Sequence, residues 1–264
     1  MATNNTANVK QWLEQSDIDY FTHFVKAWIP FNAWYRHSYA TLEQERQILD
    51  EIKIDGNKIR SRFIAKLEST DPDSQEIRNH IAALHRRLGD DPLKDKKGNN
   101  ISFESVSVGP NPKSKEELEF YGWKYTVERQ KTPAKQVYCE VVDKSSAVFK
   151  AIIQPGAWDI NAFQLHADYL ALELKKQSPL LTCYKKANPY LFRSLLASAT
   201  EKNFLEMDNY KFVRDPATIF AGVVDVLYAM RNLLFHGELV PDPQANRTYE
   251  PAYHLLRHLI ATIV

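Results

Sequence analysis

Cysteine and glycine are scarce in this 264-residue chain, and neither sign of charge is in excess. The two cysteines, Cys139 and Cys183, match no metal-binding spacing and are too few for a disulfide framework, which is typical of a reducing compartment. The 8 glycines form no phosphate-binding loop, dinucleotide-binding run or Gly-x-Ser-x-Gly turn. These absences argue against a nucleoside triphosphatase, a Rossmann oxidoreductase and an α/β-hydrolase.

The charge balance and the lack of long apolar runs limit the possible partners. Lys plus Arg number 34 against 33 Asp plus Glu, so nucleic-acid binding has to be local rather than driven by a global basic field. Segment 1–8 is polar and has no apolar signal core. We find no stretch that approaches the roughly 18 apolar residues of a membrane span. We therefore expect a cytoplasmic protein with no membrane partner.

Helical periodicity dominates both ends of the chain. After an aromatic stripe from Trp12 to Tyr35, the spacing predicts helices at 41–54, 57–68 and 71–88. Pro30 should interrupt or restart the first helix, and Thr41 with Gln44 resembles a capping box. Towards the C-terminus, helical patterns cover 159–176, 215–231 and 249–263.

The middle of the chain reads differently. Short stretches rich in β-branched and aromatic residues predict strands at 101–108, 121–129, 137–142 and 147–153. Their brief connections favour antiparallel pairing. We therefore expect a mainly α fold, a helical bundle with a small inserted antiparallel β-sheet. It is divided into an N-terminal helical part (1–98), a β-rich insert (99–155) and a C-terminal helical part (156–264).

The chemical focus is a polar cluster in the apolar helical run near the C-terminus. Arg231 and Asn232 lie inside this run, and His236 and Gly237 follow it. Burying an arginine, an amide and an imidazole is costly unless each finds a partner or performs a task. Gly237 suits the left-handed position just past a helix end, which would place His236 in the last turn.

Helix geometry relates these side chains to one another. At about 100° per residue, Asp225, Asn232 and His236 form one polar stripe. Arg231 and His236 are separated by about 140° around the axis and about 7.5 Å along it, so one helix does not aim both at a single atom. A second copy packed around a twofold axis could complete a shared cleft. Asp225 could hold Arg231 or His236 in position, or be an ordinary buried ion-pair partner.

The segment Arg231-Asn232-Leu233-Leu234-Phe235-His236-Gly237 resembles the signature of HEPN domains (higher eukaryotes and prokaryotes nucleotide-binding). The early Phe31-Asn32 pair with its aromatic neighbours is similar to a segment of some members. The resemblance covers the N-terminal helix and the two helices near the C-terminus, while the β-rich insert matches nothing in it. It implies a homodimeric, metal-independent endoribonuclease with an RNA substrate and no cofactor. Many such enzymes belong to bacterial toxin-antitoxin or antiviral defence systems, with an antitoxin or regulatory protein as partner.

The resemblance also implies roles for individual residues. The RNA 2′-hydroxyl would attack the neighbouring phosphate and leave a 2′,3′-cyclic phosphate. His236 would transfer a proton, and Arg231 would bind the phosphate and stabilise its growing charge. Asn232 would orient the imidazole or the phosphate. The alternatives are a noncatalytic HEPN-fold module that binds RNA, a nucleotide or a protein, and an enzyme that modifies RNA without cutting it.

Three other patterns invite a functional interpretation. Arg78-Asn79 followed by His85 also fits a looser form of the motif, but it lies on a helix with charges all round, and we interpret it as a surface coincidence. His254 and His258 share a helix face, with Glu250 as the only obvious third ligand, so we interpret them as surface histidines and expect no metal site.

The third pattern is a basic stretch at 175–193 that is interleaved with aromatic residues. Such a stretch could hold phosphates and stack bases, or form an ordinary solvated lysine-rich surface. In the nuclease interpretation, the β-rich insert is the natural place for target recognition or regulation.

Overall fold

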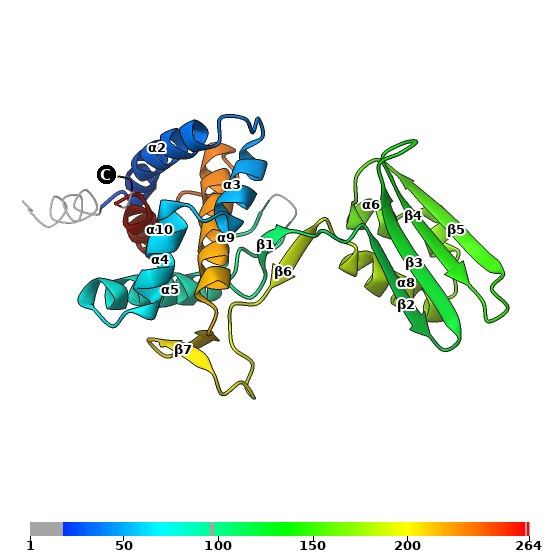
Figure 1. Ribbon diagram of the computed structural model, residues 1–264. Helices are drawn as coiled ribbons and strands as arrows, with labels where there is room; N and C mark the ends of the chain where they lie inside the picture. The colour runs from blue at the N-terminus through cyan, green and yellow to red at the C-terminus, as the bar shows by residue number, and fades with distance from the viewer. Residues whose placement is uncertain (1–17, 96–97, 262, 264) are drawn as a thin grey trace, which may run out of the picture. The chain divides into compact units, whose positions relative to one another are not determined.

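The computed structural model describes residues 18–95, 98–261 and 263 (Figure 1). The chain divides into two compact units. Unit 1 comprises Met1–Val108 and Phe192–Val264, and unit 2 comprises Gly109–Leu191. About 49% of the described residues are helical and 20% are in strands, which form one four-stranded antiparallel sheet and two small sheets. The expectation of a mainly α fold is therefore wrong, and the fold is mixed α/β.

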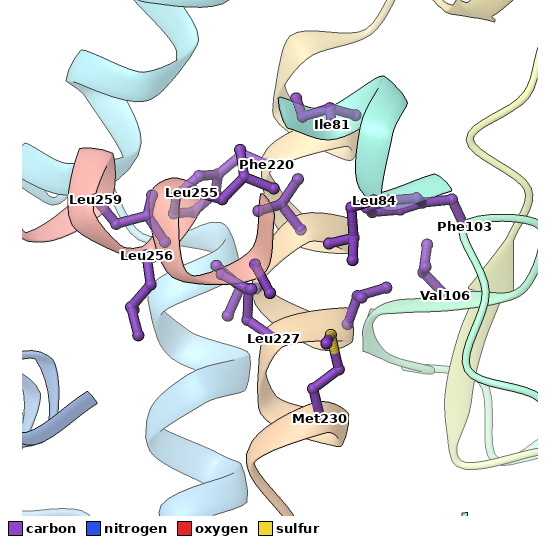
Figure 2. Close-up of a cluster of buried hydrophobic side chains, with 14 of the residues drawn as sticks. Ile81, Leu84, Phe103, Val106, Phe220, Leu227, Met230, Leu255, Leu256 and Leu259 are labelled. Atoms are coloured by element: carbon purple, nitrogen blue, oxygen red, sulfur yellow. The ribbon is translucent and has the colours of Figure 1, made fainter. Parts of the chain in front are cut away.

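Unit 1 is built around helix α9. Its helices are α2 (Tyr20–Ser38), α3 (Glu45–Ile54), α4 (Lys58–Glu68), α5 (Pro72–Asp90), α9 (Pro216–Phe235) and α10 (Pro243–Ile260). Helices α3 and α4 pack on α9, and α10 packs on α2, α4 and α5. Figure 2 shows side chains of α5, α9 and α10 gathered in one apolar cluster with Phe103 and Val106. This core fixes the helix that carries the Arg231 motif.

Aspartate caps and following prolines set the starts of several helices. The carboxylates of Asp71, Asp215 and Asp242 accept backbone N–H groups in the first turns of α5, α9 and α10, each with proline directly after the cap. Asn57 caps α4 in the same way. The first two caps agree with the helix starts predicted at 71 and 215. The start of α10 lies six residues before the expected position 249, because the Asp242 cap and Pro243 begin the helix there.

Two expectations about the N-terminal helices are wrong. Helix α2 continues through Pro30, and α3 begins at Glu45 after Gln44, which makes no side-chain capping bond. A proline in a helix leaves the carbonyl four residues earlier without its amide partner. Here that residue is Lys26, which is exposed like Pro30, so water can bond the freed carbonyl.

Unit 2 contains the four-stranded sheet β2 (Lys115–Phe120), β3 (Trp123–Gln130), β4 (Gln136–Val142) and β5 (Val148–Pro155), paired antiparallel in sequence order. Its helices are α6 (Ile160–Gln164), α7 (Ala167–Leu170) and α8 (Leu174–Lys186). Helix α8 packs on β2 and β3 over a second core, which includes Tyr125, Cys139 and Tyr184. The single helical pattern expected to reach Lys176 is therefore broken into three helices.

Short strands account for the remaining sheets. The chain passes from one unit to the other within β1 (Val106–Pro110) and within β6 (Tyr190–Arg193). These two strands pair to form one two-stranded sheet. Strands β7 (Phe204–Met207) and β8 (Tyr210–Val213) form the other. None of β2, β6, β7 and β8 was predicted, because each is four to six residues long and carries charged side chains.

Helix α9 is apolar over a longer stretch than we expected from the sequence. By length and composition alone it could cross a membrane. Most of its apolar side chains, however, lie in the core of unit 1, as is usual for a central helix of a helical unit.

Candidate functional site

The end of α9 has the geometry expected from its sequence. The helix ends at Phe235, His236 is the capping residue, and Gly237 has a φ of +64°. The Gly237 amide donates to the Leu234 carbonyl at 3.3 Å, and the Glu238 amide donates to the Leu233 carbonyl at 3.0 Å. This pair of bonds is the Schellman motif, which requires a left-handed residue such as glycine. It holds His236 at the point where the chain leaves the core.

Arg231 is held by a carboxylate from another helix. Its Nη1 lies 3.2 Å from Glu45 Oε2, and the same nitrogen donates to Asn232 Oδ1 at 3.0 Å. The guanidinium also lies 4.2 Å from the centre of the Phe235 ring. Both partners of the ion pair have only 16% of their side-chain surface exposed, so solvent screens this pair less than a surface pair.

A chain of polar contacts extends from Arg231 to helix α2. Tyr35 donates its hydroxyl hydrogen to Glu45 Oε1, and the Asn32 amide donates to the Tyr35 hydroxyl oxygen at 2.7 Å. Burial, together with the Glu45 carboxylate, raises the pKa of Tyr35, so the phenol stays protonated. The sequence interpretation noticed Asn32 and Tyr35 but missed Glu45.

The cluster keeps hydrogen-bonding capacity for a further partner. Arg231 Nε is buried and has no hydrogen-bond partner among the described residues. An unsatisfied buried donor costs about 1–3 kcal/mol, and an anion or a water molecule could remove that cost. His236 is exposed, and no hydrogen bond or ion pair to its side chain is found in the part of the chain that the structure describes. Arg231 and Asn232 are therefore joined, while His236 stands apart from both.

Asp225 does not contact the motif. Its carboxylate accepts hydrogen bonds from Lys53 Nζ at 2.8 Å, Arg46 Nη1 at 3.0 Å and the Ser107 amide at 2.7 Å. Of the two interpretations offered by helix geometry, the ordinary buried ion-pair partner is confirmed.

The looser second match to the motif is also structural. Arg78 Nη2 donates to the carbonyls of Leu67 and Ser69, at 2.6 and 2.5 Å, at the C-terminal end of α4. The His85 ring packs edge-on against Tyr210, with ring centres 4.6 Å apart. Arg78 therefore stabilises a helix end and His85 packs on the core.

A pocket of about 840 Å³ lies in unit 2, between β2, β3 and helix α8. Its lining includes Phe120, Tyr121, Trp123 and Lys175. Lys176, also in the lining, has its Nζ 4.5 Å from the centre of the Trp123 ring, with 4% of its side chain exposed. Aromatic walls with a few convergent cations are typical of a ligand site.

The turn at the edge of this pocket is strained. Tyr121 has a φ of +48° and Gly122 a φ of +76°, between strands that pair Phe120 with Trp123. In such two-residue turns asparagine, aspartate or glycine is normally found at the first position. Tyr121 is 85% exposed, and its ring packs edge-on against the neighbouring Phe120 ring, with ring centres 4.4 Å apart. The strained backbone and the exposed aromatic ring make this turn a candidate for contact with a ligand.

Comparisons of the chain with protein-family models, curated proteins and solved structures found no match. The HEPN resemblance therefore rests on the Arg231–Gly237 segment and the Phe31-Asn32 pair alone.

Proposed function

We propose that this chain is a HEPN-type endoribonuclease that cleaves RNA without a metal ion and acts as a homodimer. The observation that supports this best is the pairing of a largely buried arginine, which keeps an unsatisfied Nε donor, with an exposed histidine one turn further on. A guanidinium suits a phosphodiester, and a solvent-exposed imidazole can transfer protons. The cytoplasmic location, the defence role and a regulatory or antitoxin partner remain predictions.

The reaction that fits these groups is an internal transfer at phosphorus. One imidazole removes the proton from the 2′-hydroxyl, the 2′-oxygen bonds to phosphorus, and the bond from phosphorus to the 5′-oxygen breaks. A second imidazole protonates that leaving oxygen. Arg231 stabilises the negative charge that grows on the phosphate oxygens. Asn232, which holds Arg231 Nη1, helps fix the direction of the guanidinium.

A second copy would supply the second imidazole. Phe235 and Val240, on either side of His236, are 50% and 75% exposed, so an apolar partner surface could cover them. The test mixes the unchanged protein with an excess of the His236→Ala variant under conditions that exchange subunits. A mixed dimer keeps only one of the two imidazoles in the shared cleft, so total cleavage should fall as mixed dimers form. Dimers that exchange, as followed by mass spectrometry, yet leave total cleavage unchanged would contradict the shared cleft.

The main assay uses single-stranded RNA in the presence of EDTA. We expect shortened products with 2′,3′-cyclic phosphate and 5′-hydroxyl ends, identified by mass spectrometry. RNA that keeps its length but gains mass would instead indicate modification, and RNA that is bound without change would indicate a binding module.

The binding module is the second candidate, because one contact favours it. The Glu45 carboxylate already forms an ion pair with Arg231 Nη1. An arginine held in this way can have a purely structural role, in which it joins α9 to α3. In that case variants of Arg231 and of His236 would bind RNA or a partner protein as tightly as the unchanged protein does.

In this proposal, the aromatic pocket of unit 2 is the surface at which RNA binds before it is cleaved. A base can stack on Tyr121, while Lys175, whose side chain is 75% exposed, can approach a phosphate. This part of unit 2 includes the start of the basic stretch noted in the sequence.

Replacing Tyr121 with asparagine should separate binding from folding. Asparagine adopts the left-handed conformation more readily, so the change should stabilise the protein by about 1 kcal/mol. Loss of one stacked base should weaken binding of an RNA octamer by about 5- to 100-fold. Thermal melting and fluorescence anisotropy check the two effects, with Tyr121→Phe as the control that keeps the ring. If Tyr121→Asn binds the RNA octamer as tightly as the unchanged protein does, the pocket has no role in RNA binding.

A further inference from the structure

Helices α5 and α10 bring together two pairs of side chains that the sequence presented separately. Glu76 and His80 are one turn apart on α5, and His254 and His258 are one turn apart on α10. Residues four apart share a helix face, and the two helices pack together in unit 1. Three of these residues, Glu76, His80 and His258, place one ligand atom each within 4.8 Å of one another.

The distances in this cluster match a tetrahedral metal site better than a set of hydrogen bonds. His80 Nε2 lies 3.5 Å from Glu76 Oε1, and His258 Nε2 lies 3.9 Å from the same oxygen. Both are long for an N–H···O bond, which is normally about 2.9–3.0 Å. Ligand atoms about 2.0–2.2 Å from a tetrahedral Zn²⁺ ion are about 3.3 Å apart. The two spacings to Glu76 Oε1 exceed this value by about 0.2 and 0.6 Å, and all three ligand atoms lie within 4.8 Å of one another, so small side-chain rotations have to close the site around an ion.

The His80 imidazole has an unused ligand atom and a fixed orientation. His80 Nε2 is buried and makes no hydrogen bond within the described ranges. The His254 ring stacks on His80, 4.6 Å away and tilted by only 4°, which holds the His80 ring plane.

We propose that Glu76, His80 and His258 bind one divalent transition-metal ion, with Zn²⁺ as the best match. Two imidazoles and a carboxylate suit Zn²⁺ and leave the fourth position of a tetrahedron for water or another ligand. His258 also lines a small pocket of about 90 Å³, next to Arg62 and Lys66, in which such a ligand could lie. His254 is a positioning residue. Glu250, the third ligand considered from the sequence, instead accepts a hydrogen bond from the Tyr20 hydroxyl at 3.0 Å.

The bound ion would join α5 to α10 without taking part in RNA cleavage, so this site is independent of the proposed nuclease. The experiment uses the full chain without a histidine tag, stripped with EDTA and then freed of chelator. Zn²⁺ is titrated by calorimetry and by competition with a chromogenic chelator, and Co²⁺ is used as a spectroscopic probe. We expect one ion per chain, a higher melting temperature and the strong visible Co²⁺ bands of a four-coordinate site.

Variants assign the ligands. Glu76→Gln, His80→Gln and His258→Gln should each abolish tight binding and the rise in melting temperature. His37→Gln, a change at an exposed histidine of α2, should alter neither. His254→Phe keeps a flat ring on His80 and should retain the one-to-one stoichiometry, with affinity lowered by no more than about 10- to 100-fold.

Two results would overturn the site. One is equally tight binding in the Glu76→Gln and His258→Gln variants, and the other is binding only at millimolar Zn²⁺, which would indicate an adventitious ion only. Glu76 is exposed, so Glu76→Gln should keep the fold even if a histidine variant does not, and melting of the metal-free proteins verifies this. Cleavage of RNA in EDTA tests the nuclease separately, so either proposal can fail without the other.

Discussion

His236→Ala is expected to lower RNA cleavage by about 10²- to 10⁴-fold, the usual contribution of a general acid or base. The same change should hardly alter folding. The imidazole is exposed, and its side chain makes no hydrogen bond or ion pair within the described residues. We therefore expect the free energy of unfolding to stay within about 0.5 kcal/mol of its original value. Initial cleavage rates in EDTA, compared with urea unfolding of the same samples, measure both effects.

His37→Ala is the matched control, because it removes an exposed histidine from α2 and should keep full activity. Arg231 needs a gentler change than alanine, since alanine would leave Glu45 without its cation. Arg231→Lys keeps the charge but loses the planar fork of donors, and we expect a loss of about 100-fold or more in rate with little loss of stability. Equal cleavage rates for His236→Ala and the unchanged protein would refute the nuclease proposal.

Local signals in the sequence were sufficient for the helix ends around this site. Asp215 with Pro216 begins α9, and Gly237 ends it, because caps and left-handed glycines act within a few residues. The partner of Arg231 could not be found in this way. Glu45 lies on a different helix, and only tertiary packing places its carboxylate 3.2 Å from the guanidinium.

The error in fold class has a similar origin. Strand β2 has no buried residue, and four of its six side chains are charged, so its sequence carries none of the β-branched pattern used to predict strands. Its place in the sheet comes from pairing with β3, in which Leu118 faces Tyr125. Pairing partners likewise decide β7 and β8.

The proposed metal site could be predicted only in part from the sequence, through the histidines of α10. The spacing of His254 and His258 indicated a shared helix face, and Glu76 with His80 has the same spacing on α5. Neither pair alone suggests a complete ligand set. Only the packing of α5 on α10 brings Glu76 within 3.9 Å of His258.

Asp225→Ala is expected to lower the free energy of unfolding by about 3–5 kcal/mol, the usual cost of breaking one side of a buried ion pair. The Lys53 side chain is fully buried, with its Nζ 2.8 Å from Asp225 Oδ1. Burial already lowers the pKa of Lys53, and the Asp225 carboxylate is the main group that opposes this shift. Without the carboxylate, an ammonium group beside Arg46 would lose its nearest counter-charge, and the Ser107 amide would lose its acceptor.

A double variant distinguishes this cause from general damage to the core. Replacing both charges, in Lys53→Met with Asp225→Leu, removes the buried ammonium that has lost its nearest counter-charge and keeps only Asp50 at 3.4 Å, so the double variant should be less destabilised than Asp225→Ala alone. Urea unfolding followed by circular dichroism compares the single and double variants. A loss below about 1 kcal/mol in Asp225→Ala would mean that water reaches Lys53 and screens its charge. Because Asp225 contacts neither Arg231 nor His236, Asp225→Asn, if folded, should cleave RNA at the normal rate.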